Sequence, residues 1–111
     1  MFPRQQRLTR QEFTKYFQSG KRWFHTDLQI IYYPSPSLKT AIVVSKKVNK
    51  SAVGRHLIKR QSSHALREVL KERQIKQGVF IVILKPLPVK DGKFIFNNLK
   101  KALGETIAKI T

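Results

Sequence analysis

Apolar and polar positions follow a helical spacing near the start of the chain. Three aromatic side chains recur at i, i+3 and i+4 within residues 9–19, which is typical of a helix with one buried face. Thr9 and Glu12 fit a capping box, in which each side chain bonds the backbone amide of the other residue. Gly20 follows the last residue of this segment and is placed to end the helix. The pattern therefore predicts a short N-terminal helix.

Two further helices are predicted later in the chain. An apolar stripe with a period near 3.6 residues predicts a long helix over residues 51–74, with Asn49 or Ser51 as its cap. A second stripe predicts a C-terminal helix that is capped by Asn97 or Asn98 and covers a sheet.

The strand-like segments lie between these helices. Residues 27–33 alternate imperfectly between two faces, and residues 40–45 are a β-branched, apolar run. Proline and serine at residues 34–37 form a turn, so the two strands are expected to pair as an antiparallel hairpin. Residues 79–84 are wholly apolar, as expected of a central strand that is covered on both faces. Residues 94–96 are expected to be a short extended piece.

These elements form a single domain over residues 1–111, in the order α-β-β-α-β-α. Residues 21–27 are expected to be a polar and aromatic connector. Strand, long helix and strand over residues 40–84 make a βαβ unit, in which the third strand lies parallel to the second. The general rule for such units predicts a right-handed crossover. The fold class is therefore α+β, an α/β sandwich of helices packed on a sheet.

The charge of the chain narrows the choice of partner. Its 111 residues include 23 Lys plus Arg against 6 Asp plus Glu, a net charge of +17. This excess indicates nucleic acid or an anionic membrane surface. The longest apolar run, residues 79–84, is far shorter than the roughly 20 residues of a membrane helix, so no membrane partner is expected. The absence of cysteine excludes disulfides and thiolate metal sites, and without an export signal the expected location is the cytoplasm.

Residues 45–60 concentrate this charge where the long helix begins. The stretch holds six lysines and arginines, one histidine and no acid. Because like charges repel one another, packing does not account for such a density, whereas polyphosphate would relieve the repulsion. RNA is therefore the leading candidate ligand. The candidate contacts are Lys46, Lys47, Lys50, Arg55, His56, Lys59, Arg60 and Arg67.

The same stretch resembles a known signature. The residues that carry the resemblance are Val43 to Val48, Asn49, Ala52, Val53, Arg55, Ile58, Lys59 and Arg60. They are similar to the motif region of the bacterial ribonuclease P protein family, the small basic subunit of a ribozyme that removes 5′ leaders from precursor tRNAs. Where that family usually has Arg-Asn-Arg, this chain has Arg55, His56 and Leu57. The N-terminal pattern of Arg7 to Thr9, Glu12, Phe13, Phe17 and Gly20 to Arg22 is similar as well.

The resemblance implies a fold and a division of labour. The fold would be that of domain 2 of ribosomal protein S5, with a left-handed βαβ crossover. The N-terminal helix and one sheet face would hold the single-stranded leader, and Phe13, Phe17 and Tyr32 are the candidate residues. The partners would be ribonuclease P RNA and precursor tRNA. The RNA subunit and its Mg²⁺ ions would cut the phosphodiester, while the chain itself would bind no metal, cofactor or small-molecule substrate and hold no catalytic residue.

Other functions fit part of the sequence. A general RNA-binding or ribosomal-type protein would share the charge and size, but would not prefer tRNA that carries a 5′ extension. A protein nuclease would need a general acid and base, for which His25, His56 and His64 are the histidines at hand. A histidine on a basic helix is more often a phosphate or base contact. A DNA-binding module is the third alternative, although no helix-turn-helix spacing is visible.

Overall fold

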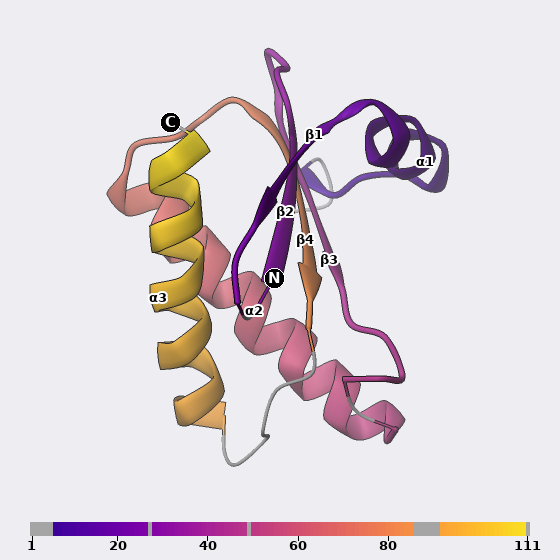
Figure 1. Cartoon of the computed structure of the whole chain (residues 1–111), viewed down its shortest axis with the longest axis vertical. Coiled ribbons are helices and arrows are strands. Elements are labelled where there is room, and N and C mark those ends of the chain that lie inside the picture. The colour runs from indigo at the N-terminus through magenta and orange to yellow at the C-terminus, as the bar shows by residue number, and fades with distance from the viewer. Residues whose placement is uncertain (1–5, 27, 49, 86–91, 111) are drawn as a thin grey trace.

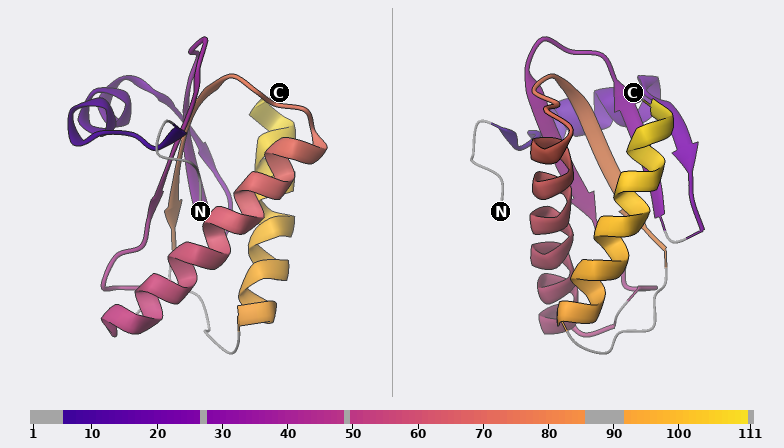
Figure 2. Two further views of the ribbon diagram at one scale, coloured as in Figure 1. Left: turned by 180° about the vertical axis from the view of Figure 1, so that it is seen from behind. Right: turned by 90° about the vertical axis from the view of Figure 1, so that its left-hand side faces the viewer.

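A computed structural model of the chain describes residues 6–26, 28–48, 50–85 and 92–110. These residues form a sheet of four strands in the order β1-β2-β4-β3. Helices α2 and α3 cover one face of this sheet, and α1 lies on the other (Figure 1; Figure 2). In chain order the elements are α1 (Arg10–Ser19), β1 (Lys21–Phe24), β2 (Leu28–Tyr33), β3 (Leu38–Val43), α2 (Ala52–Glu72), β4 (Gly78–Leu84) and α3 (Gly92–Ile110). The predicted α+β class is confirmed.

Strand β4 is the centre of the sheet. It pairs antiparallel with β2, where Ile31 lies opposite Ile81, and parallel with β3, where Ala41 lies opposite Ile81. All its residues are buried except the half-buried Ile83, as the wholly apolar run predicts. Helix α2 connects β3 to β4, so the predicted βαβ unit with parallel strands is confirmed. Its left-handed sense stays a prediction from the resemblance.

Three expectations about the extended segments are wrong. β2 and β3 do not form a hairpin, because β4 lies between them and pairs with both. Residues 21–24 are not a connector but β1, which pairs antiparallel with β2. Residues 94–96 belong to α3, which begins at Gly92 rather than near Asn97. A run of three apolar residues fits a strand or a helix equally well, so the neighbouring helical period decides.

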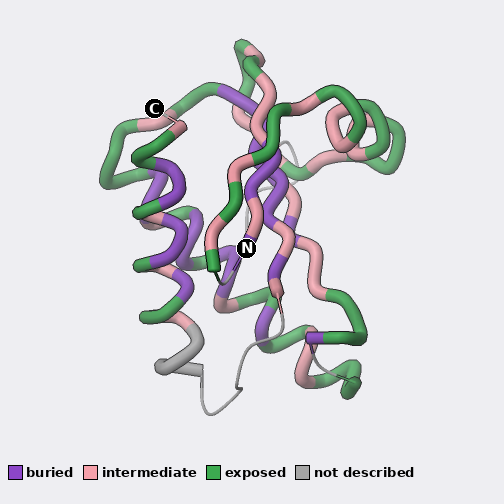
Figure 3. Tube along the Cα trace, viewed as in Figure 1, coloured by how far each residue is buried: buried purple, intermediate pink, exposed green. Residues whose placement is uncertain are grey.

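Side chains along β2 point alternately into two separate cores. Leu28 and Ile30 belong to the main core, which fills the space between the sheet and helices α2 and α3. Ile31 belongs to a second, smaller core, against which Phe13 and Phe17 of α1 pack. Figure 3 shows that the buried residues of α2 and α3 face the sheet, whereas α1 holds no fully buried residue. Much of the sheet face that carries α1 is therefore only half-buried.

The predicted caps set the starts of α1 and α2. The backbone N–H of Thr9 donates to Glu12 Oε1 at 3.0 Å, and the N–H of Glu12 donates to Thr9 Oγ1 at 3.2 Å, so the capping box is confirmed. The hydrogen bond from the Thr9 backbone lowers the pKa of Glu12 and keeps its carboxylate ionised. In α2 the N–H of Gly54 donates to Ser51 Oγ at 3.2 Å, so Ser51 is the cap; Asn49 lies outside the described residues.

Gly20 lets α1 pack directly on β2. Gly20 ends α1 as the sequence predicts, but its φ of −73° is ordinary extended backbone and not the left-handed conformation that favours glycine. A Cβ at this position would lie 2.4 Å from Ile31 Cγ2 and 2.8 Å from the carbonyl oxygen of Tyr16. The close approach of the two elements, rather than the turn itself, requires glycine.

We expect Gly20→Ala to lower the free energy of unfolding by about 1–3 kcal/mol, because the added methyl group forces α1 away from β2. Gly104→Ala is the matched control. A Cβ at Gly104, inside α3, meets nothing within 4 Å, so this change should stabilise the protein by about 0.5–1 kcal/mol. Urea unfolding followed by circular dichroism measures both. Equal stability of wild type and Gly20→Ala would contradict the contact with Ile31.

Candidate nucleic-acid interface

The N-terminal half of α2 places cations along the free edge of β3. Arg55, His56 and Lys59 line a hollow of about 410 Å³ against residues 42–44. The Arg55 guanidinium is held in place, because its Nη1 donates to the carbonyl oxygen of Lys50 at 2.9 Å. His56 and Lys59 are exposed. The end of β3 and the first turns of α2 therefore form one positively charged surface.

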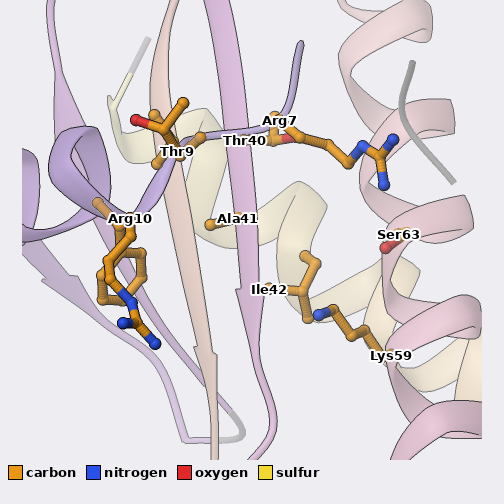
Figure 4. Close-up of a pocket in the computed structure, with 10 residues that line it drawn as sticks. Arg7, Thr9, Arg10, Thr40, Ala41, Ile42, Lys59 and Ser63 are labelled. Carbon is orange, nitrogen blue, oxygen red and sulfur yellow. The ribbon is translucent and has the colours of Figure 1, made fainter. Parts of the chain in front are cut away.

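A second cavity adjoins this hollow and shares Lys59 with it. Its volume is about 360 Å³, and we call it the basic pocket (Figure 4). Arg10 lies on the α1 side of β3, whereas Lys59 projects from α2 on the other side and the Arg7 side chain points toward α2 (Figure 4). Among the residues that the structure describes, none that lines the pocket is acidic; the lining residues are Arg7, Leu8, Thr9, Arg10, Phe13, Thr40, Ala41, Ile42, Lys59 and Ser63. This combination of cations and apolar walls suits a phosphate joined to a base.

The N-terminal segment brings Arg7 and Arg10 to this edge. Arg7 forms a parallel bridge with Thr40 of β3. The N–H of Leu8 donates to the Thr40 carbonyl oxygen at 3.1 Å, and Thr40 Oγ1 donates to the Gln6 carbonyl oxygen at 3.1 Å. These long-range bonds fix the start of α1 beside β3.

The sheet face that carries α1 continues from the basic pocket as a surface of aromatic and aliphatic side chains. The rings of Phe13 and Phe17 stack with centroids 5.5 Å apart, and the Arg22 guanidinium lies 4.7 Å from the centre of the Phe17 ring. Ile83 is half-buried on this face. Phe24 lies opposite Gln29 of β2, so its side chain points to the same face of the sheet, and it is 64% exposed. We call this surface the open sheet face. The half-buried Phe17 beside its guanidinium and the exposed Phe24 are suited to stacking on unpaired bases.

Of the three predicted leader-binding residues, the structure brings only Phe13 and Phe17 together. Tyr32 lies on the opposite face of the sheet, where its ring packs 5.1 Å from that of Phe80 in the main core. The reason is the alternation of side chains along β2, which points Ile31 toward α1 and Tyr32 away from it. Tyr33 takes the α1 side instead.

The eight predicted RNA contacts fall into four places. Arg55, His56 and Lys59 line the hollow beside β3, as described above. Lys46 and Lys47 are exposed in the loop that leaves β3, and Lys50 is exposed just before α2. Arg60 is exposed on α2, and Arg67 lines a separate hollow near the C-terminal end of that helix.

Acidic side chains gather on the other side of α2, at its seam with α3. Lys100 Nζ lies 3.2 Å from Glu68 Oε2 and 2.7 Å from Glu72 Oε1. Glu105 Oε2 lies 3.5 Å from His25 Nε2. The positive surface beside β3 is therefore separated from these carboxylates by the body of α2.

The histidines do not converge on one place. His25 lies beside Glu105 of α3, and His64 lies beside Glu68, with its ring 4.8 Å from that of Phe96. His56 lines the hollow beside β3. Within the described ranges no three His, Asp or Glu side chains are grouped so that they could hold a metal ion. In the same part of the chain no helix is long and apolar enough to cross a membrane.

Comparison with known proteins decides the family. The family model described as Ribonuclease P matches residues 2–110. The chain belongs to the ribonuclease P protein family. It is 42% identical over 84 residues to the ribonuclease P protein component of Picosynechococcus sp., covering 73% of this chain and 71% of that protein. It is 33% identical over 115 residues to the component of Cyanothece sp., covering 86% and 87%.

Solved structures of ribonuclease P proteins share the fold. The Staphylococcus aureus protein superimposes with a TM-score of 0.65 at 22% identity, covering 95% of this chain and 96% of that one. The Thermotoga maritima protein superimposes with a TM-score of 0.60 at 19% identity, covering 89% and 96%.

Sequence reasoning missed several residues of the candidate interface in this ribonuclease P family member. Arg10 and the exposed Phe24 were not singled out, and Arg7 and Arg22 entered only as parts of a family pattern. The pairing of β1 with β2 positions Arg22 and Phe24, and the bridge to Thr40 positions Arg7. A short strand such as residues 21–24 has no periodicity long enough to reveal it.

Proposed function

We propose that this chain is the protein subunit of ribonuclease P, which binds the catalytic RNA and the 5′ leader of precursor tRNA and so assists endonucleolytic removal of the leader. The observation that carries the proposal is that the basic pocket and the open sheet face are continuous. Phe13 lines the pocket and also stacks on Phe17 of the open face. One surface thus offers cations for phosphates and rings for unpaired bases. Membership of the family supports the same assignment.

The cations around α2 would contact the RNA subunit. Exposed lysines and arginines neutralise phosphates and release counterions, which supplies most of the affinity for RNA. They would also lessen the repulsion between the RNA subunit and the precursor tRNA, two polyanions that must lie side by side. Arg55 is held against the Lys50 carbonyl, so its guanidinium is oriented before RNA binds. The contacts we assign are Lys46, Lys47, Lys50, Arg55, His56, Lys59, Arg60 and Arg67.

The open sheet face would receive the single-stranded leader. Stacking on an aromatic side chain is worth about 1–3 kcal/mol per base and tolerates any base, as a subunit that serves many tRNAs requires. Phe17, with Arg22 over its ring, and the exposed Phe24 supply this surface. Phe24 takes the place that the sequence assigned to Tyr32, which faces the main core.

Catalysis would belong to the RNA subunit and its Mg²⁺ ions, in the cytoplasm. The chain would supply binding and orientation, since its surface around the basic pocket is built from cations, which attract phosphates but do not activate water. The dispersed positions of His25, His56 and His64 support this division, because acid–base cleavage needs two such groups at one phosphate.

The double variant Lys59→Ala, Arg60→Ala should weaken binding to ribonuclease P RNA and reduce the slope of log K against log salt by about 1–2, because each lost phosphate contact releases one counterion fewer. The measurement is a filter-binding titration between 50 and 200 mM salt. Lys101→Ala with Lys109→Ala removes the same charge from exposed positions of α3 and should leave the slope unchanged. Equal slopes for the wild type and both double variants would remove Lys59 and Arg60 from the interface.

Phe17→Leu should weaken the binding of precursor tRNA to the assembled complex by about 5- to 150-fold, the equivalent of 1–3 kcal/mol of stacking. Leucine keeps the apolar packing beneath α1 but removes the ring. Mature tRNA is the matched ligand, and its affinity should not change. Wild-type protein that binds precursor and mature tRNA equally well would contradict the proposed function and leave a general RNA-binding protein.

A further inference from the structure

We propose that the C-terminal end of α2 carries a second nucleotide-binding pocket, separate from the basic pocket and the open sheet face. A cavity of about 480 Å³ lies where α2 ends beside the start of β3. This volume falls within the range of about 300–1,000 Å³ that is common for small-molecule sites. Three cations line the cavity together with apolar and amide side chains, the main ones being Arg67, Lys71, Lys76, Leu38, Ile75 and Gln74.

The end of α2 holds an unusual backbone conformation at this cavity. The N–H of Ile75 donates to the Leu70 carbonyl oxygen at 2.9 Å, and the N–H of Gln74 donates to the Lys71 carbonyl oxygen at 3.1 Å. This is the bonding of a Schellman-type helix end, in which the residue after the cap adopts a positive φ and is usually glycine or asparagine. Gln74 has a φ of +57°, and no other non-glycine among the described residues has a positive φ.

Glutamine at such a position is conformationally costly, because its Cβ crowds the backbone. Glycine would end the helix with less strain but would leave the cavity without an amide side chain. Gln74 is exposed and lines the cavity, and its side-chain amide can both donate and accept hydrogen bonds. A ligand with mixed donors and acceptors, such as the edge of a base, fits this group.

The rest of the cavity fits the other parts of a nucleotide. Arg67, Lys71 and Lys76 are exposed, and no acidic side chain lines the cavity within the described part of the chain, so the rim attracts a phosphate. Leu38 and Ile75 are half-buried and pack on the main core, so they offer an apolar wall for a base. A cationic rim for the phosphate, an apolar wall for the face of a base and an amide for the edge of that base together match a nucleotide.

The N-terminal segment separates the two pockets. Gln6 lines the new pocket, whereas Arg7, the next residue, lines the basic pocket. Lys59 and Lys71 are twelve residues apart on α2, about 18 Å along the helix axis. We assign the nucleotide to an RNA strand that runs along α2 from the basic pocket to the second pocket. In this assignment the inference rests on the proposed function.

The test is a titration of the full-length protein, labelled at its methyl groups, with the RNA pentamer rA5 by NMR. The methyl signals of Leu38 and Ile75 should shift and saturate, and inorganic phosphate at the same concentration should not move them. Lys71→Gln should weaken the binding of rA5 at this site at least fivefold, whereas Lys101→Gln, on α3, should not.

Two outcomes would contradict the inference. Shifts that are confined to the open sheet face, as reported by the methyl group of Ile83, would overturn the second pocket and leave the proposed function intact. Saturation by free AMP as tight as by rA5 would overturn its assignment to an RNA strand.

Gln74→Gly separates a binding role from a structural one. The variant should melt a few degrees higher than the wild type, because glycine relieves the positive-φ strain. It should also bind rA5 at the Leu38 and Ile75 methyls at least threefold more weakly. A variant that is more stable and binds rA5 as the wild type does would overturn the role of the amide.

Discussion

The parallel pairing of β3 with β4 is the constraint on which the rest of the molecule depends. Parallel neighbours cannot be joined by a tight turn and need a long crossover, which here is α2. Helix α2 crosses the sheet obliquely (Figure 2), so that its basic residues lie along the edge of β3. Among the described residues, backbone contacts along that edge are confined to the segment from Gln6 to Leu8, which contacts Thr40. The position of the cationic surface is thus a consequence of the sheet topology.

Three of the described carboxylates lie away from the cationic surface of α2. Glu68 and Glu72 are paired with Lys100 at the seam between α2 and α3, and Glu105 lies beside His25. Exposed ion pairs of this kind contribute little to stability, but their position keeps these three carboxylates away from the hollow beside β3. The net charge of +17 opposes folding through repulsion. The main core between the sheet and the two long helices must therefore supply most of the stabilisation.

The sequence predicts the helices of this fold better than its sheet. Capping and periodicity are local signals, so Thr9, Glu12 and Ser51 mark the helix starts correctly, and the apolar run of β4 indicates a central strand. Which strands pair depends on contacts far apart in the sequence, and for that reason the expected hairpin of β2 and β3 is wrong.

The same limit applies to the candidate interface. The cations of α2 follow from composition, whereas Tyr32 was assigned to the wrong face because its orientation depends on the register of β2. Arg10 reaches the candidate interface through the long-range bridge of Arg7 to Thr40, whereas Phe24 is placed there by the pairing of the short strand β1 with β2.

The most direct test of the account is cleavage of precursor tRNA at low Mg²⁺ by a bacterial ribonuclease P RNA, with and without this protein, beside a reaction that contains the protein alone. The account predicts that the protein stimulates cleavage only when the RNA is present. Cleavage by the protein alone would contradict the division of labour and place catalysis on the chain itself. No stimulation in the presence of the RNA, together with tight but indiscriminate RNA binding, would contradict the assignment as a ribonuclease P subunit.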